Sequence, residues 1–165
     1  MTKPKEKMGI LERRRIEAEI IKPIYAAMKR HVGKEKAQAI LEEAIASDAI
    51  KAGQSMAQKQ KSGATLKNFA AMQYLWEADD ALKVELLTSD DQRLDYNVTR
   101  CRYAEMYQAM ELGEIGSILS CTRDAHFIEG YNPDIEMSRT QTIMQGAAFC
   151  NFRYHLKSNT GSEKV

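Results

Sequence analysis

The segment GEIGSILSCTRDAHF, residues 113–127, carries four side chains whose types and spacing are suited to chemistry. Glu114, Ser117, Cys121 and Asp124 are separated by three, four and three residues. In a helix of about 3.6 residues per turn, these intervals place all four on one face. A carboxylate one turn from a thiol can hold the thiol's proton or orient a water molecule beside it. The spacing therefore predicts a catalytic face that includes Cys121 and Asp124.

The opposite side of the same helix is apolar and includes Ile115 and Leu119. It can dock the helix on a neighbouring element, which leaves the polar side at an edge or along a cleft wall. A thiolate nucleophile needs a pKa lowered by a cation or a helix N-terminus, and Arg139 and Arg153 are the candidate cations. Because cysteine is among the most frequently buried residues, plain packing is the alternative for Cys121.

Two segments alternate polar and apolar residues, as strands with one wet face do. In residues 94–101, one side carries Leu94, Tyr96 and Val98, and the other carries Asp95, Asn97, Thr99 and Cys101. In residues 149–156, one side carries Cys150, Phe152, Tyr154 and Leu156, and the other carries Asn151, Arg153 and His155. The pattern places Cys150 in the core. For Cys101, lining a site and packing at a strand end both stay open.

The elements that would position these residues follow from periodicity and from turn residues. Helices are predicted over residues 10–31, 34–62, 65–81 and 103–112 and from residue 114, and strands over 94–101, 135–144 and 149–156. Asp79 and Asp80 are an alternative end for the third helix. The predicted fold class is α+β, with a helical N-terminal half followed by a small antiparallel sheet in the order β-α-α-β-β and helices packed on it. We expect a disordered N-terminus over 1–9, a single domain over 10–157 and a disordered tail over 158–165.

Composition narrows the class of protein. The 165 residues carry a formal net charge of +1, which gives no global attraction to nucleic acid or to a membrane. No apolar run approaches the roughly 18 residues of a transmembrane helix, and the N-terminus lacks the apolar region of a secretory signal. Three cysteines at long spacings suit reduced thiols. These features predict a cytoplasmic protein with no nucleic-acid or membrane partner.

Two longer stretches match the sequence pattern of a known family: VTRCRYAEMYQAMELGEIGSILSCTRD and GYNPDIEMSRTQTIMQGAAFCNFRY. Together they make the segment from 98 to 157 resemble the L-2-amino-thiazoline-4-carboxylic acid hydrolase family. The matching positions are Cys101, Glu114, Cys121 with Asp124, Asn132 with Pro133, Arg139, Gly146 and Cys150. The helical half is similar in a less distinctive way, through KEKAQAILEEAI. One position departs from the family pattern, because Asn151 stands where Cys-Asp-Phe would have its aspartate.

The resemblance implies a hydrolase that opens a cyclic amidine ring carrying a carboxylate. The thiolate of Cys121 would attack the carbon between the ring heteroatoms, or a water molecule held by Asp124 would, with Asp124 or Glu114 shuttling protons. Arg139 or Arg153 would pair with the substrate carboxylate. The implied substrate-binding residues are Arg139, Arg153, Asn97, Thr99, Cys101, Ser117 and Asn151. The expected partner is a small-molecule carboxylate substrate, and no cofactor or metal is predicted.

Other interpretations stay open at this stage. Glu114 could complement a helix N-terminus, and the two arginines could form cross-strand pairs. The three cysteines with Asp124 or His155 could form a metal site if the fold brought them together, although burial of Cys150 argues against it. The departure at Asn151 favours a non-catalytic small-molecule-binding or regulatory domain. The basic N-terminal region suggests a partner-binding helical protein, and homo-oligomer formation is left open.

Overall fold

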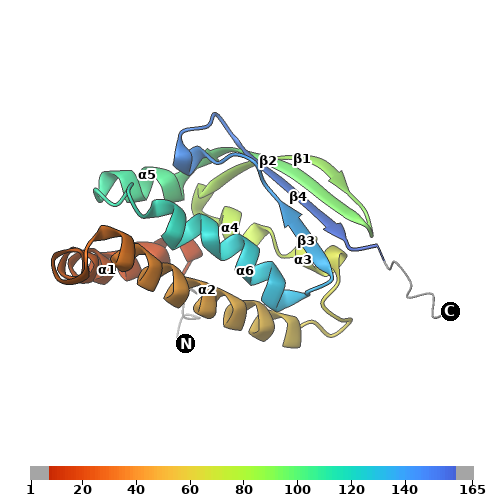
Figure 1. Ribbon diagram of the computed structural model, residues 1–165. Helices are drawn as coiled ribbons and strands as arrows, with labels where there is room; N and C mark the ends of the chain where they lie inside the picture. The colour runs from red at the N-terminus through yellow and green to blue at the C-terminus, as the bar shows by residue number, and fades with distance from the viewer. Residues whose placement is uncertain (1–7, 159–165) are drawn as a thin grey trace, which may run out of the picture.

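The computed structural model describes residues 8–158, and Figure 1 shows their arrangement. The predicted disordered ends fall mostly on residues 1–7 and 159–165, which lie outside the described residues. The elements in chain order are α1 (Ile10–Val32), α2 (Lys34–Gln58), α3 (Leu66–Ala71), α4 (Tyr74–Glu77), β1 (Leu82–Ser89), β2 (Arg93–Cys101), α5 (Arg102–Ala109), α6 (Thr122–Tyr131), β3 (Ile135–Ser138) and β4 (Cys150–Leu156). A π-helical turn, Ser117–Cys121, leads into α6. The α+β fold class is confirmed.

The sheet has four antiparallel strands in the order β1-β2-β4-β3. Strand β1 was not predicted. It lies at the edge of the sheet, and although Leu82, Val84 and Leu86 alternate with polar residues at its start, none of its residues is fully buried, and Leu86 and Leu87 are exposed. The predicted strand over 135–144 was too long, since β3 ends at Ser138. Beyond that residue, the backbone N–H groups of Thr140 and Gln141 donate to the side chain of Asn151 instead of to a strand.

The predicted helix over 65–81 is broken into short pieces. Thr65 caps α3 by accepting a hydrogen bond from the backbone N–H of Asn68, as an N-cap residue does. A 3₁₀ turn follows α4, and there Asp79 and Asp80 have φ values of 62° and 55°. A left-handed backbone at two successive residues cannot continue an α-helix, so the chain turns and enters β1.

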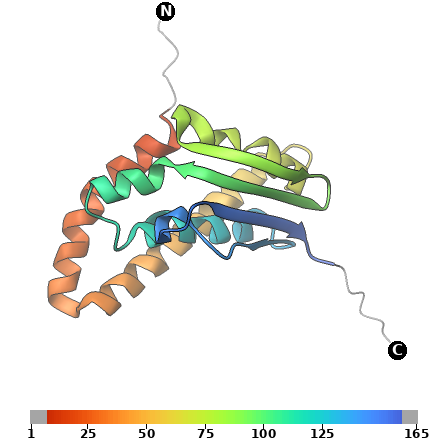
Figure 2. The same cartoon turned by 90° about the horizontal axis from the view of Figure 1, so that it is seen from above.

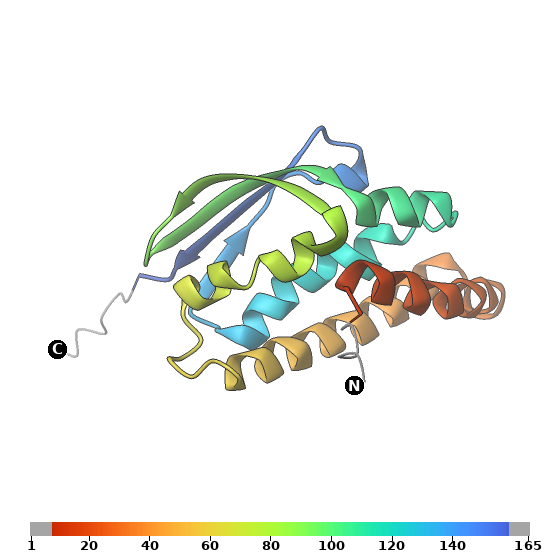
Figure 3. The ribbon, with the colours of Figure 1, turned by 180° about the vertical axis from the view of Figure 1, so that it is seen from behind.

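The helices cover one face of the sheet, and Figures 1 and 3 show α6 lying between α2 and the strands. Seen from above in Figure 2, the connection between α1 and α2 projects beyond one end of the sheet. Helices α2 and α6 pack backbone to backbone through two glycines. A Cβ atom on Gly53 would lie 2.1 Å from the carbonyl oxygen of Phe127, and one on Gly130 would lie 2.1 Å from that of Ile50.

The buried side chains form two clusters. The first lies between the sheet and helices α3 and α6, and includes Leu66, Phe69, Tyr96, Val98, Ile128, Tyr131, Phe152 and Tyr154. The second joins α1, α2 and α5 to the segment before the π-helical turn, and includes Ala18, Tyr25, Ala37, Ile45, Tyr103, Tyr107, Leu112 and Ile115. Within residues 8–158, no helix has the length and apolar character needed to span a membrane.

Candidate functional site

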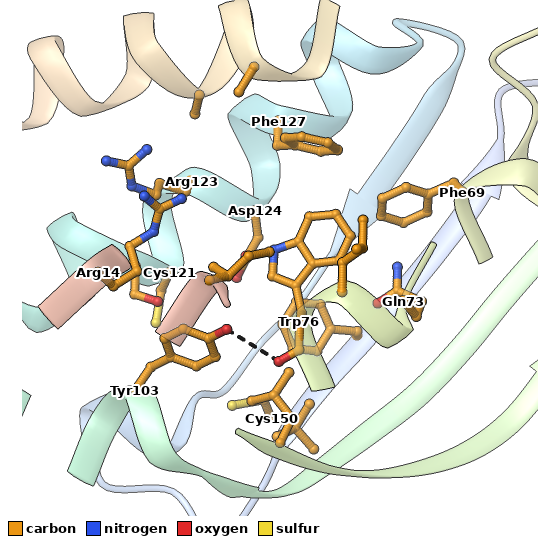
Figure 4. Close-up of a pocket in the computed structure, with 18 of the residues that line it drawn as sticks. Arg14, Phe69, Gln73, Trp76, Tyr103, Cys121, Arg123, Asp124, Phe127 and Cys150 are labelled. Atoms are coloured by element: carbon orange, nitrogen blue, oxygen red, sulfur yellow. Dashed lines mark hydrogen bonds between the residues drawn. The ribbon is translucent and has the colours of Figure 1, made fainter. Parts of the chain in front are cut away.

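A cavity of about 340 Å³ lies between the helices and the face of the sheet that they cover. Residues of both buried clusters line it, so the cavity sits where the two clusters meet. Its aromatic lining consists of Phe69, Trp76, Tyr96, Tyr103, Phe127, Phe152 and Tyr154. Its polar lining includes Arg14, Gln73, Cys101, Cys121, Arg123, Asp124 and Arg139, several of which are drawn in Figure 4. A concave, mainly apolar space with a few convergent polar groups is typical of a small-molecule site.

Asp124 and Arg139 form an ion pair at this cavity. Nη1 of Arg139 donates to Oδ2 of Asp124 at 2.5 Å, and Nη2 donates to the backbone carbonyl oxygen of Cys121 at 3.0 Å. The guanidinium lies 4.8 Å from the ring centre of Phe152, in a cation–π arrangement. The Arg139 side chain is only 11% exposed, and that of Asp124 is 28% exposed. The pair is therefore largely withdrawn from water and fixed in orientation.

Burial shifts the acidity of the Asp124 carboxyl. Loss of hydration raises its pKa above the usual value, and the positive charge of Arg139 opposes that rise. A carboxyl group with a raised pKa at a cavity wall can exchange protons with a ligand more readily than an exposed carboxylate.

All three cysteine side chains line the cavity as free thiols. Burial, reinforced by the negative charge of Asp124, raises the pKa of Cys121 to about 12. Burial also raises the pKa of Cys101 to about 11, and it raises the pKa of Cys150. The thiols are therefore protonated at neutral pH, and nearby Arg139 does not reverse this. Cys150 is 6% exposed, as the prediction of a core position requires.

Cys101 reaches the cavity because β2 contains a bulge. Lys83 pairs with Arg100, but the next residue of β1, Val84, pairs with Val98, so Thr99 is an extra residue in β2. An extra residue shifts the alternation of side chains by one position beyond it. Val98 and Cys101 therefore both line the cavity, whereas uninterrupted alternation placed Cys101 beside Asn97 and Thr99.

Four of the five predicted substrate-binding residues that do not line the cavity lie on strands: Asn97, Thr99, Asn151 and Arg153. They lie on the other face of the sheet, since alternate residues of the same strands, such as Tyr96 and Phe152, face the cavity. On that outer face, Nη2 of Arg153 donates to Oδ1 of Asn97 at 3.1 Å. The expected grouping of these residues on one side is correct, but the helices and the cavity cover the opposite, apolar side.

Asn151 nevertheless supports the site from outside. Its Oδ1 accepts hydrogen bonds from the backbone N–H groups of Thr140 and Gln141, both at 3.0 Å, and its Nδ2 donates to Oγ1 of Thr140 at 2.8 Å. These bonds hold the chain immediately after Arg139. An aspartate in this place could accept the same two backbone hydrogen bonds, so the departure at this position leaves the support of Arg139 in place.

Glu114 and Ser117 also lie outside the lining of the cavity. Glu114 is bound at the surface between α1 and α2, where it pairs with Lys34 at 2.9 Å and Lys29 at 3.1 Å and accepts from the hydroxyl of Tyr25. The hydrogen bonds from Lys34 and Lys29 lower its pKa to about 2. The expected common face fails because Glu114 precedes the helix and the π-helical turn replaces the 3.6-residue repeat.

Several residues that line the cavity were not among the predicted site residues. Arg123 lines it and pairs with Asp48 at 2.7 Å and with Glu17 at 3.6 Å. Arg14, from α1, binds the same Glu17 at 2.7 Å, and Figure 4 shows Arg14 and Arg123 near Cys121. Arg14 and Arg123 come from α1 and α6, which no short sequence motif connects. Their proximity in the cavity wall therefore depends on how the two helices pack.

The amide of Gln73 is another lining group without a sequence signal. Its Nε2 atom is buried and has no hydrogen-bond partner among the described residues.

The three cysteines with Asp124 or His155 were also candidate metal ligands. In residues 8–158, no group of three or more His, Cys, Asp or Glu side chains is placed to hold a metal ion. His155, one of the ligands considered for such a site, lies 3.5 Å from Glu136.

Comparisons with known proteins give one family and one fold. The family model described as L-2-amino-thiazoline-4-carboxylic acid hydrolase matches residues 13–154. The search of curated proteins finds no match. The phenol-responsive sensory domain of the transcription activator PoxR, solved with phenol, is similar in structure with a TM-score of 0.53 and 10% identity, over 83% of this chain and 73% of that one.

A second similar structure is a trafficking protein particle complex subunit 3 from Naegleria fowleri, covalently bound to palmitic acid. Its TM-score is 0.50 at 10% identity, over 87% of this chain and 96% of that one. At this identity the two structures show a shared fold and nothing more.

Proposed function

The chain belongs to the L-2-amino-thiazoline-4-carboxylic acid hydrolase family, and from this premise we propose that it hydrolyses a small cyclic amidine that carries a carboxylate. The observation that carries the proposal is the Asp124–Arg139 ion pair at the wall of a mainly aromatic cavity. A protonated amidine needs a carboxylate nearby, and ring opening needs a group that can give and take protons. Asp124 can do both, because its pKa is raised by burial.

In the proposed reaction, water is the nucleophile. Asp124 accepts a proton from the water as its oxygen bonds to the ring carbon that lies between sulfur and nitrogen. The same proton then passes to the leaving ring atom as its bond to that carbon breaks. The second proton of the water leaves the carbon-bound oxygen as the carbonyl forms, and Asp124 accepts it. If the nitrogen leaves, the product is S-carbamoyl-cysteine, and if the sulfur leaves, it is N-carbamoyl-cysteine. One water molecule is consumed in either case.

Cys121 is the other nucleophile that the residues suggested. With a pKa of about 12, its thiol is almost wholly protonated at neutral pH, and a thiol is a much weaker nucleophile than a thiolate. We therefore assign Cys121 to the wall of the cavity, where it packs against the ligand, and we assign the attack to water.

The substrate carboxylate requires a cation. Both Nη atoms of Arg139 are already bonded, to Asp124 and to the carbonyl oxygen of Cys121, and Arg153 lies on the outer face of the sheet. Arg14 lines the cavity and uses Nη1 in its bond to Glu17, which leaves the rest of a planar fork for a carboxylate. Arg14 is therefore the proposed carboxylate-binding residue.

A ligand-binding domain without turnover is the second candidate. The observation in its favour is that both similar structures hold an apolar or aromatic ligand, phenol in one and palmitic acid in the other. Asn151, the departure that first suggested this alternative, does not line the cavity, and its side chain bonds to Thr140 and Gln141 in the loop beside Arg139.

Incubation of the purified protein with L-2-amino-thiazoline-4-carboxylate separates the two candidates. Mass spectrometry would follow both carbamoyl-cysteine products, with heat-denatured protein as the control, and calorimetry would measure binding. Product formation well above the control is expected of a hydrolase. Binding without product would contradict the hydrolase and favour the second candidate.

A further inference from the structure

The cavity is larger than a bare thiazoline carboxylate requires. Its volume of about 340 Å³ falls in the range of roughly 300–1,000 Å³ that is usual for drug-sized ligands. A single five-membered ring with an amino group and a carboxylate would occupy only part of this space. The remainder must be filled either by water or by a further part of the ligand, and the chemistry of the walls distinguishes the two.

Much of the cavity wall is aromatic. The ring centres of Trp76 and Phe127 are 5.3 Å apart, those of Phe69 and Trp76 are 6.3 Å apart, and those of Phe69 and Tyr154 are 5.1 Å apart. Several of these contacts are edge-on or tilted, which leaves ring faces turned toward other neighbours. An apolar enclosure of this kind offers water few hydrogen bonds and suits a flat apolar group.

One polar group interrupts this aromatic end. The Nε2 atom of Gln73 is buried and unpaired within the described residues, although Gln73 lines the cavity. A buried donor without an acceptor is unfavourable, so it marks a position where a ligand atom would be bonded. Figure 4 shows the indole of Trp76 between Asp124 on one side and Gln73 on the other.

We infer that the ligand is a ring carboxylate with an aryl-sized apolar extension that ends in a neutral hydrogen-bond acceptor, and that Gln73 recognises this acceptor. The carboxylate and the ring lie at the Asp124 end, as the proposed function requires. The extension lies among Phe69, Trp76 and Phe127, and its terminal oxygen accepts from Nε2 of Gln73. The inference rests on the proposed function for the ring end alone.

Binding of three probes to the wild-type protein tests the inference by calorimetry. The probes are L-2-amino-thiazoline-4-carboxylate, 2-phenyl-thiazoline-4-carboxylate and 2-(4-hydroxyphenyl)-thiazoline-4-carboxylate. The phenyl probe should bind at least about tenfold more tightly than the amino compound, because its ring is buried among aromatic side chains. The hydroxyphenyl probe should bind up to about tenfold more tightly than the phenyl probe, because its oxygen accepts a hydrogen bond from Gln73. Equal affinity for all three probes would overturn the inference.

The variant Gln73→Leu tests the residue itself. It should lose the gain due to the hydroxyl and still bind the phenyl probe, and its melting temperature should equal or exceed that of the wild type, since an unpaired buried amide is removed. The exposed Gln108 gives the matched control, Gln108→Leu, which should keep both preferences. A hydroxyl preference that survives Gln73→Leu would contradict the assignment. If the variant folded poorly, the comparison of probes on the wild type would still decide.

The two proposals fail separately. Turnover of the amino compound with no tighter binding of the aryl probes would contradict the inference about the aryl extension and leave the hydrolase proposal intact. Tight, Gln73-dependent binding of the aryl probes with no turnover of the amino compound would contradict the hydrolase proposal and support the inference.

Discussion

Cys121 and Asp124 are separated by three residues and both line the cavity, yet their surroundings give them different chemistry. Burial suppresses ionisation of the thiol, and the carboxylate of Asp124 adds to that effect. The same burial raises the pKa of the carboxyl group, but Arg139 keeps an ionised form accessible. Of the two residues, Asp124 is the one suited to moving protons.

Replacement of the thiol tests this division of roles. In Cys121→Ser, turnover of L-2-amino-thiazoline-4-carboxylate should fall by less than about tenfold, because serine fills most of the same space and no covalent step is lost. Steady-state rates measured by product mass spectrometry would give the answer. A loss of about a hundredfold or more, with the fold intact by circular dichroism, would show that the sulfur itself attacks.

Glu114 gives a second prediction, about stability and not turnover. Its folded-state pKa of about 2 lies below the ordinary value near 4.3, so its contacts stabilise the fold above that ordinary value and this contribution is lost as the pH falls toward 2. Because the side chain is 34% exposed, solvent screening should keep the effect of Glu114→Gln below about 1 kcal/mol at pH 7.

Thermal unfolding from pH 2 to pH 7 would measure this difference. The stabilities of the wild type and of Glu114→Gln should converge near pH 2, and the two proteins should have the same turnover at pH 7. Glu42→Gln, at an exposed position, is the control and should show no pH-dependent gap. A hundredfold loss of turnover in Glu114→Gln alone would restore the catalytic role that its spacing first suggested.

Single inserted residues in two elements explain much of what the sequence could not predict about the site. The motif spacing placed Cys121 and Asp124 correctly at one cavity, and the alternation in the last strand placed Cys150 in the core. The bulge at Thr99 and the π-helical turn each break the regular repeat on which such predictions rest. Neither has a compositional signature in this chain, so Cys101 was assigned to the wrong face and Glu114 to the wrong surface.

The crossing of α2 and α6 shows a related effect. Glycine lowers helix propensity, yet α2 continues through Gly53. The structure supplies the reason: the backbone of α6 passes so close that no side chain fits at Gly53 or at Gly130. Propensity is outweighed here by tertiary packing.

Gly53→Ala should therefore destabilise the protein by about 1–3 kcal/mol or more, even though alanine favours helix, because α2 and α6 must move apart. Gly113→Ala is the matched control, since the nearest atom to a Cβ there is 4.0 Å away. Urea unfolding of both variants would test the prediction. Wild-type stability in Gly53→Ala would mean that the close contact between the two helices is absent in solution.

At the scale of the whole molecule, alternation showed the two faces of the sheet but not which of them the helices cover. Polar residues such as Asn97 and Arg153 suggested a site on the wet face, because substrate binding needs polar groups. The cavity instead lies against the apolar face, and its polar groups come from segments far apart in the chain, among them α1, the residue before α4, α6 and the segment after β3. The fold class follows from local patterns, whereas the site depends on how distant segments meet.

The position of the cavity between the two buried clusters makes a prediction about dynamics. A bound ligand would contact residues of both clusters, so 2-phenyl-thiazoline-4-carboxylate should slow amide hydrogen exchange in residues 66–77, which include α3 and α4 and contribute Phe69, Gln73 and Trp76 to the lining. Exchange at the β1–β2 turn, residues 89–93, should stay unchanged. Equal slowing throughout the chain, or none, would contradict a ligand seated in this cavity.

The most direct test of the account is the turnover of L-2-amino-thiazoline-4-carboxylate by Asp124→Asn, with binding of the phenyl probe measured on the same sample. Asp48→Asn is the control, since Asp48 pairs with Arg123 but is 65% exposed and does not line the cavity. We predict that Asp124→Asn binds the probe within a few-fold of the wild type and loses about 10²–10⁴-fold in turnover, while the control stays active. Wild-type turnover in Asp124→Asn would contradict the central claim that this carboxyl group moves the protons of the reaction.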